Sequence, residues 1–187
     1  MSTLLRALRV AALSLALTGA VALAGAAPAH ADRNYPPPTA GTTYLWATNS
    51  GTNPSHTRCV EVGGWRTDDF AQVNQYRCHW GANQQWRLNY SNGSYYLVDV
   101  HSGKCLEVLG WGVNYGDPIV QYSCHLGNNQ RWQLIWHEQV GLASFRNVHS
   151  GLCLSVDGMY TDDFRRFVQN TCYPFTNQRF EPMYVAG

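Results

Sequence analysis

The sequence has little charge and, beyond its first 31 residues, no apolar run of membrane-spanning length. Charged residues make up 13% of the 187 residues, and lysine occurs once. No stretch keeps the apolar period of an amphipathic helix, and no G-x-S-x-G elbow of a serine hydrolase is present. A chain without a basic surface is not expected to bind nucleic acid or an anionic membrane.

The N-terminal segment has the features of a signal peptide. Arg6 and Arg9 supply a positive start, residues 10–27 are small and mostly apolar, and Ala29-His30-Ala31 fits the small-x-small cleavage rule. An uncleaved membrane anchor is the alternative. The alanine-rich run and the cleavage motif favour removal of residues 1–31, so we predict a secreted, extracellular protein without membrane insertion.

The mature chain is predicted to contain a spacer followed by one domain. Removal of Arg6 and Arg9 leaves 13 − 2 = 11 basic residues against 12 acidic ones, a formal charge of −1. Residues 32–42 include three consecutive prolines and are interpreted as a stiff spacer without core residues. Residues 43–187 are long enough for one domain with its own core.

Two markers recur in register along this domain. Paired cysteines lie 19 positions apart, and successive pairs are offset by 46 and then 48 positions. An Asn-Gln-x-aromatic motif recurs at the same two intervals, which indicates an internal triplication. The cysteine pairs are Cys59 and Cys78, Cys105 and Cys124, and Cys153 and Cys172; the motifs are Asn83-Gln84-Gln85-Trp86, Asn129-Gln130-Arg131-Trp132 and Asn177-Gln178-Arg179-Phe180.

Paired cysteines in a secreted chain favour disulfides over metal ligation. Six cysteines allow 15 connectivities, and bridging within each repeat is the simplest one that treats the repeats alike. A disulfide that closes a loop of about 20 residues stabilises the folded state by on the order of 3 kcal/mol. The cysteines lack the C-x2-C spacing of structural zinc sites, so we expect neither a metal nor a cofactor.

Within each repeat the local signals are those of β-strands. Short β-branched or aromatic stretches such as 95–98, 105–108 and 119–122 are separated by Ser-Gly, Asn-Gly and Gly-Asp turns. Three such repeats predict a closed all-β domain with threefold pseudo-symmetry.

The second repeat resembles a known lectin repeat. Gly103-Lys104-Cys105-Leu106-Glu107-Val108, then Tyr122-Ser123-Cys124-His125 and Asn129-Gln130-Arg131-Trp132, are similar to the Q-x-W repeat of the ricin B-chain lectin family, which includes family 13 carbohydrate-binding modules. The resemblance covers about residues 43–185. It implies a β-trefoil, in which a six-stranded barrel is capped by three hairpins, with one potential sugar pocket per repeat. It also implies a core position for Trp86, Trp132 and Phe180.

Strand geometry brings candidate sugar-binding side chains together. Alternate residues of a strand share a face, so Glu61 lies with Cys59, whereas Val60 and Val62 face the other way. On the partner stretch, Asn74 and Tyr76 share the face of Cys78. A carboxylate can accept hydrogen bonds from two hydroxyls, and an aromatic ring can pack on the apolar face of a pyranose.

The resemblance points to the same positions and extends them. It implies site roles for Glu, an aromatic residue, the residue after the second cysteine and the Asn-Gln pair. The candidate carbohydrate-binding residues are Glu61, Asn74, Tyr76, His79, Asn83 and Gln84 in the first repeat, and Glu107, Tyr122, His125, Asn129 and Gln130 in the second. The third repeat has Ser155, Asn170 and Tyr173 at the matching positions, so we predict a silent third pocket.

Three features leave alternatives open. The family usually has Asp where this chain has Glu61 and Glu107, and these longer side chains could instead cap a nearby amide group. Trp65 and Trp111 could then serve as platforms, whereas the third repeat has Met159 at this position. The repeated Thr-Asp-Asp-Phe segments (67–70 and 161–164) are interpreted as turn chemistry. Trp80 and His101 are expected to pack.

The combined pattern predicts a non-catalytic carbohydrate-binding module. A glycosidase needs two carboxyls about 5 to 10 Å apart, whereas Glu61 and Glu107 belong to different repeats, so we expect no enzymatic activity. The expected partners are galactose-, xylose- or arabinose-containing glycans or polysaccharides; the sequence leaves open which sugar and which oligomeric state. A β-trefoil protease inhibitor or protein-interaction module with degenerate pockets is the alternative.

Overall fold

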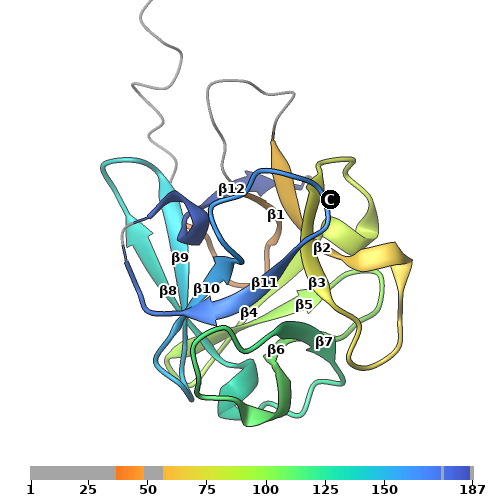
Figure 1. Ribbon diagram of the computed structural model, residues 1–187, viewed down its shortest axis with the longest axis vertical. Helices are drawn as coiled ribbons and strands as arrows, with labels where there is room; N and C mark the ends of the chain where they lie inside the picture. Colours follow the sequence, from red (N-terminus) through yellow and green to blue (C-terminus); the bar gives the residue numbers. More distant parts are fainter. Residues whose placement is uncertain (1–36, 49–56, 174, 186–187) are drawn as a thin grey trace, which may run out of the picture. The chain divides into compact units, whose positions relative to one another are not determined.

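The computed structural model describes residues 37–48, 57–173 and 175–185, and these form twelve β-strands (Figure 1). The predicted signal peptide and the start of the predicted spacer lie outside the described residues. In the part described, no helix is long and apolar enough to span a membrane. The strands are β1 (Thr43–Thr48), β2 (Arg58–Val62), β3 (Val73–Arg77), β4 (Trp86–Ser91), β5 (Ser94–Asp99), β6 (Cys105–Val108), β7 (Ile119–Tyr122), β8 (Trp132–His137), β9 (Leu142–Asn147), β10 (Cys153–Val156), β11 (Arg165–Asn170) and β12 (Phe180–Tyr184).

Six of the strands close into a barrel. The antiparallel pairings run from β1 to β4, β4 to β5, β5 to β8, β8 to β9, β9 to β12 and β12 back to β1. Each of these strands therefore has a partner on both sides, which removes the free edges that an open sheet would expose. This ring confirms the predicted all-β class and the six-stranded barrel.

The other six strands form three hairpins, one from each repeat. They are β2–β3, β6–β7 (green in Figure 1) and β10–β11 (blue). Each hairpin continues from the barrel through a short pairing with β1, β5 or β9. Neighbouring hairpins also meet, through β3 with β11 and through the isolated bridges Gln72 to Val120 and Pro118 to Val168. Together these pairings confirm the β-trefoil.

The core contains the aromatic residue of each repeated motif. Trp86, Trp132 and Phe180 are fully buried, as predicted. The two indole N–H groups find partners, because Trp86 Nε1 donates to the Val60 carbonyl at 3.0 Å and Trp132 Nε1 to the Leu106 carbonyl at 3.1 Å. Truncation of such a fully buried aromatic residue to Ala typically lowers the free energy of unfolding by about 3 to 5 kcal/mol.

Each disulfide joins the first strand of a hairpin to the segment that directly follows its second strand, within one repeat. Cys59 bridges Cys78, Cys105 bridges Cys124, and Cys153 bridges Cys172, with Cα–Cα distances of 5.1, 5.1 and 5.0 Å. This confirms the predicted connectivity. The first cysteine of each pair lies opposite the residue two before the second, and these opposed pairs are Cys59 with Tyr76, Cys105 with Tyr122 and Cys153 with Asn170.

The end of the predicted spacer already belongs to the folded domain. Pro38 is buried, the Gly41 amide donates to the Leu88 carbonyl at 2.6 Å, and the Leu88 amide donates to the Thr42 carbonyl at 3.0 Å. The prediction of a spacer up to residue 42 therefore extended too far, because composition does not reveal which backbone groups dock on β4.

Asp99 is a buried carboxyl at a place where the third repeat has an amide. Asp99 lies opposite Trp86, and Asn147 lies opposite Trp132. The Asn147 Nδ2 donates to the carbonyls of Asn129 and Arg131, whereas Asp99 Oδ2 is buried without a hydrogen-bond partner. Desolvation by burial raises the pKa of Asp99 to about 6, against hydrogen bonds from Ser102 that lower it.

We expect Asp99→Asn to raise the free energy of unfolding at neutral pH by about 1 to 3 kcal/mol. Because the folded-state pKa lies above the unfolded one, the folded state binds more protons between about pH 4 and pH 6, so Asp99 makes stability fall as pH rises through this window. Urea denaturation at several pH values measures the difference, which should vanish near pH 4. The reciprocal variant Asn147→Asp should lose stability at neutral pH; an unchanged pH profile in Asp99→Asn contradicts the assignment.

Candidate functional site

The second repeat contains a cavity of about 350 Å³, at the small end of the range for ligand pockets. Glu107 from β6 and Tyr122 from β7 line this cavity. Gly110 and Trp111 of the 3-10 helix η4 (Leu109–Trp111), His125 and Phe70 complete the lining. Glu107 lies across the strand pair from Val120, and Tyr122 lies across it from Cys105. The period of two along β6 and β7 thus places carboxylate and ring on one face.

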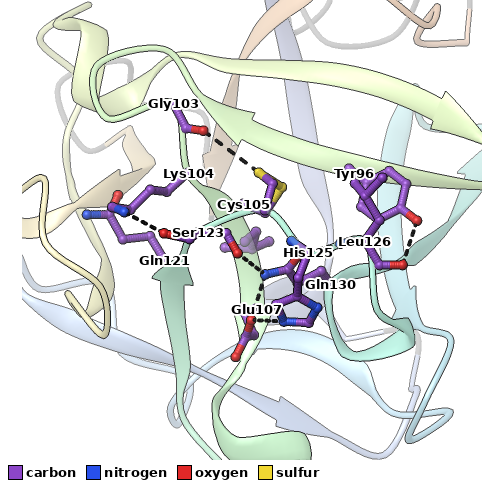
Figure 2. Close-up of a disulfide and its surroundings, with 12 residues drawn as sticks. Tyr96, Gly103, Lys104, Cys105, Glu107, Gln121, Ser123, His125, Leu126 and Gln130 are labelled. Carbon is purple, nitrogen blue, oxygen red and sulfur yellow. Dashed lines mark hydrogen bonds and ion pairs between the residues drawn. A yellow bond between two sulfur atoms is a disulfide. The ribbon is translucent and has the colours of Figure 1, made fainter.

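A chain of hydrogen bonds orients the Glu107 carboxylate (Figure 2). The Gly127 amide donates to His125 Nδ1 at 3.1 Å, so the imidazole proton lies on Nε2. This Nε2 donates to Glu107 Oε2 at 3.0 Å, as Figure 2 shows. Gln130 Nε2 donates to the same oxygen at 2.6 Å. Figure 2 shows the second carboxylate oxygen pointing away from His125 and Gln130. This Oε1 accepts no hydrogen bond from the described residues and is not sealed from solvent.

The first repeat has the same arrangement with its own residues. Gly81 N donates to His79 Nδ1 at 3.1 Å, His79 Nε2 lies 3.1 Å from Glu61 Oε2, and Gln84 Nε2 donates to that oxygen at 2.7 Å. Desolvation by burial raises the pKa of Glu61, and the hydrogen bonds from Gln84 and His79 oppose this rise. One oxygen of each Glu carboxylate therefore caps a glutamine amide, as the alternative interpretation of the sequence expected. The other oxygen has no hydrogen-bond partner among the described residues.

A tryptophan and a histidine form one wall of each arrangement. Trp65 stacks on His79 with ring centroids 6.0 Å apart, and Trp111 stacks on His125 at 5.9 Å. Both tryptophans have left-handed backbone, with φ of 56° and 59°, and both are about half exposed. This conformation is unfavourable for a bulky residue.

The following repeat holds each tryptophan in place. His101 Nε2 lies 3.2 Å from the Trp65 carbonyl oxygen, and His149 Nε2 lies 3.1 Å from that of Trp111. Both imidazoles also contact their indole edge-on, with centroids 5.1 Å apart. His101 thus packs against the Trp65 indole, although its own side chain is exposed to solvent.

The Asn-Gln pairs lie behind the pockets. Asn83, Gln84, Asn129 and Gln130 are fully buried. Gln84 accepts the His79 amide and donates to Glu61 and to the Arg77 carbonyl, and Asn83 Nδ2 donates to the Val62 carbonyl at 3.1 Å. Their surfaces are closed to solvent, so this structure assigns these amides a supporting role, which differs from the direct sugar contact that the resemblance implied.

Asn74 distinguishes the first arrangement from the second. It lies opposite Glu61 on β3, where the second repeat has the apolar Val120. Its Oδ1 is buried without a hydrogen-bond partner and would lie 2.8 Å from a Cβ added at Gly63. The predicted juxtaposition of Glu61, Asn74 and Tyr76 is therefore present in the strand register.

The third repeat keeps the supporting amides and lacks the pocket groups. Gln178 still accepts the Tyr173 amide and donates to the Thr171 carbonyl, as Gln84 and Gln130 do at their own positions. The carboxylate is replaced by Ser155, whose buried hydroxyl accepts from Asn177 Nδ2 at 3.0 Å. The fold of this repeat therefore does not require a carboxylate.

The sequence did not predict the ring contacts of Phe70 and Phe164 or the exposure of Trp80. Phe70 lies against Tyr122, a residue of the next repeat, and Phe164 lies against Tyr76, each with ring centroids 4.9 Å apart. The Thr-Asp-Asp-Phe segments are thus more than turns, and their recurrence in the first and third repeats was the available signal. Trp80 is about half exposed with φ of 63°, so the expectation that it packs was wrong.

Comparisons with known proteins place this fold. A closed barrel with three hairpins and a repeated pocket defines a three-repeat β-trefoil. The family model of the ricin-type beta-trefoil lectin domain matches residues 51–180, so the chain belongs to this family. No curated protein matches the chain at the level of sequence.

Solved structures give the same result. The designed threefold-symmetric protein ThreeFoil is 32% identical, with a TM-score of 0.68, over 76% of this chain and 99% of ThreeFoil. An exo-β-1,3-galactanase from Clostridium thermocellum is 26% identical, with a TM-score of 0.70, over 81% of this chain; the match spans only 31% of the galactanase. A Macrolepiota procera ricin B-like lectin in complex with lactose shares the fold at 18% identity and a TM-score of 0.66, over 79% of this chain and 99% of that lectin.

We expect Gly127→Ala to separate the His125 ring from Trp111 without unfolding the domain. An added Cβ would lie 2.7 Å from His125 Cε1 and 2.8 Å from Trp111 Cη2, whereas the Gly127 φ of −70° suits alanine. The ¹H and ¹⁵N resonances of the His125 imidazole, recorded at about pH 8, should lose the ring-current shift from Trp111 and the Nε2–H tautomer. Phe175 occupies the matching position of the third repeat, so Phe175→Ala is the control. Unchanged His125 resonances in Gly127→Ala would contradict the stacked arrangement.

Proposed function

We propose that the chain is a secreted carbohydrate-binding module whose first and second repeats each bind a sugar of a galactose-, xylose- or arabinose-containing glycan, without catalysis. The observation that carries this proposal is the unpartnered oxygen of Glu107 and of Glu61, presented beside a tyrosine ring. The buried side of each carboxylate is satisfied by His and Gln. The free Oε1 can accept hydroxyl hydrogen bonds, and the ring can pack on the apolar face of a pyranose.

The relatives are consistent with this ligand class. Membership of the lectin-domain family supports carbohydrate binding. The galactanase that shares this domain acts on a galactose polymer, and the M. procera lectin was solved with lactose. The polymer that the galactanase acts on and the lactose bound by the lectin both contain galactose. Galactose therefore stays among the proposed sugars, together with xylose and arabinose.

The geometry supports binding over hydrolysis. Among the described residues that line the cavity of the second repeat, Glu107 is the one carboxyl. Glycoside hydrolysis uses two carboxyls that flank one bond at about 5 to 10 Å. The Glu107 carboxylate is also engaged by His125 and Gln130 on one oxygen, an arrangement that orients an acceptor.

Glu61→Ala combined with Glu107→Ala should abolish glycan binding while the domain remains folded, because the third repeat folds with Ser155 at this position. We expect each single variant to weaken its own pocket at least about tenfold, roughly 1.4 kcal/mol. A glycan array and sedimentation with insoluble xylan, galactan and arabinan measure the loss, and Ser155→Ala is the matched control. Binding that persists in the double variant would refute the pocket assignment. A wild-type chain that binds no glycan but inhibits a protease in titration would favour the inhibitor alternative.

We expect the mature protein to begin at or near Asp32 and to be exported. Expression of the full chain in a secreting host, followed by intact mass and N-terminal sequencing of the protein in the medium, tests this. Replacing Ala29 and Ala31 by bulky residues should block cleavage, since signal peptidase requires small side chains there. Retention of residues 1–31 on the wild-type protein would contradict export by cleavage.

A further inference from the structure

Phe70 and Phe164 hold exposed rings on a backbone that favours glycine. Both have φ of 66° and are 57% and 71% exposed. The second repeat has Gly116 at the corresponding place, with φ of 84°, which shows that glycine meets the backbone requirement. A bulky residue in the left-handed region is unfavourable, and such exposed rings gain little from burial. These rings therefore need an explanation other than the fold.

The loop that carries each phenylalanine is fixed by the neighbouring repeat. Gln121, fully buried on β7, donates from Nε2 to the carbonyls of Arg66 and Asp68 at 3.0 and 2.9 Å. The Phe70 amide donates to the Gln121 carbonyl at 2.9 Å. The Asp69 carboxylate accepts the Ser123 amide at 2.9 Å.

The loop of the third repeat is attached to the first repeat in the same way. Gln75 donates from Nε2 to the carbonyls of Tyr160 and Asp162, and the Phe164 amide donates to the Gln75 carbonyl at 2.9 Å. The Asp163 carboxylate accepts the Arg77 amide at 3.1 Å. Each phenylalanine is thus held in a defined position over a pocket of another repeat.

Each phenylalanine adds a second aromatic surface to that pocket. The ring planes of Phe70 and Tyr122 are inclined at 52°, and those of Phe164 and Tyr76 at 47°. Phe70 lines the same cavity as Glu107 and Trp111. Two rings at such angles cannot both lie flat against one face of a single pyranose, so each pair offers two separate stacking surfaces.

We propose that Phe70 and Phe164 contact the ligand, and that the pockets recognise an oligosaccharide of two or more units instead of a lone monosaccharide. This proposal rests on the proposed function. The first sugar is held by the Tyr ring and the Glu carboxylate, and the adjoining sugar packs against the Phe ring supplied by the neighbouring repeat. The third repeat, which lacks the Glu and Tyr of a pocket, also receives Gly116 where the others receive phenylalanine. A phenylalanine ring is therefore present at the two repeats that have both the Glu and the Tyr proposed to hold the first sugar, and absent at the repeat that lacks them.

Glycine variants separate ligand contact from structural support. Phe70→Gly in a Glu61→Ala background isolates the second pocket, and Phe164→Gly in a Glu107→Ala background isolates the first. Calorimetric titration with galactose against lactose, and with xylose against xylotriose, compares one sugar with several. We expect the affinity for the oligosaccharide to fall roughly tenfold, the affinity for the monosaccharide to change less than about twofold, and the thermal stability to stay equal or rise, since glycine relieves the backbone.

Matched variants make each outcome decisive. Tyr115→Gly removes an exposed aromatic residue from the corresponding loop beside the silent pocket and should change no affinity. Phe70→Asn repeats the test with a residue that tolerates left-handed backbone. An equal loss for monosaccharide and oligosaccharide, or no loss for either, would overturn the proposal while leaving the proposed function intact. Failure of the wild-type chain to bind any of the four sugars and any array glycan would overturn both.

Discussion

The arrangement of each repeat depends on one buried glutamine. Gln84, Gln130 and Gln178 each accept a backbone amide just after the second cysteine and donate to a carbonyl just before it. An amide side chain can satisfy both groups at once because it carries a donor and an acceptor. Buried backbone groups that lack such partners would destabilise the hairpin. The Asn that precedes each Gln acts on the first strand of the hairpin, through its last carbonyl.

The pocket carboxylates are an addition to this framework. In the first two repeats the same Gln Nε2 also donates to Glu61 or Glu107, and the third repeat retains the framework with Ser155 instead. The fold and the proposed binding chemistry are thus separable at the level of single residues. The Glu side chain reaches the amide and the imidazole with one oxygen and leaves the other free, so the replacement of Asp by Glu remains compatible with an acceptor that faces outward.

The sequence predicted those features that depend on local periodicity. The Cys59–Cys78 disulfide and the burial of Trp86 were predicted from a repeat that can be recognised in the sequence itself. The juxtaposition of Glu61 and Asn74 was predicted from the alternation of side chains along a strand. The position of Phe70 did not follow, because it depends on how β7 of the next repeat receives a loop. The exposure of Trp80 depends on the sign of one backbone angle, which residue type does not reveal. Residue type likewise does not reveal which groups the amide of Gln84, Gln130 or Gln178 bonds to.

The cyclic exchange of loops changes what counts as one binding unit. A pocket in this domain is assembled from one repeat's hairpin and the preceding repeat's loop, in the order first to second and third to first. A duplicated or transplanted repeat would therefore carry the hairpin of one pocket and the loop of another, and would complete neither alone. If the proposed function holds, a substitution in the loop of one repeat would therefore alter recognition at the hairpin of the next.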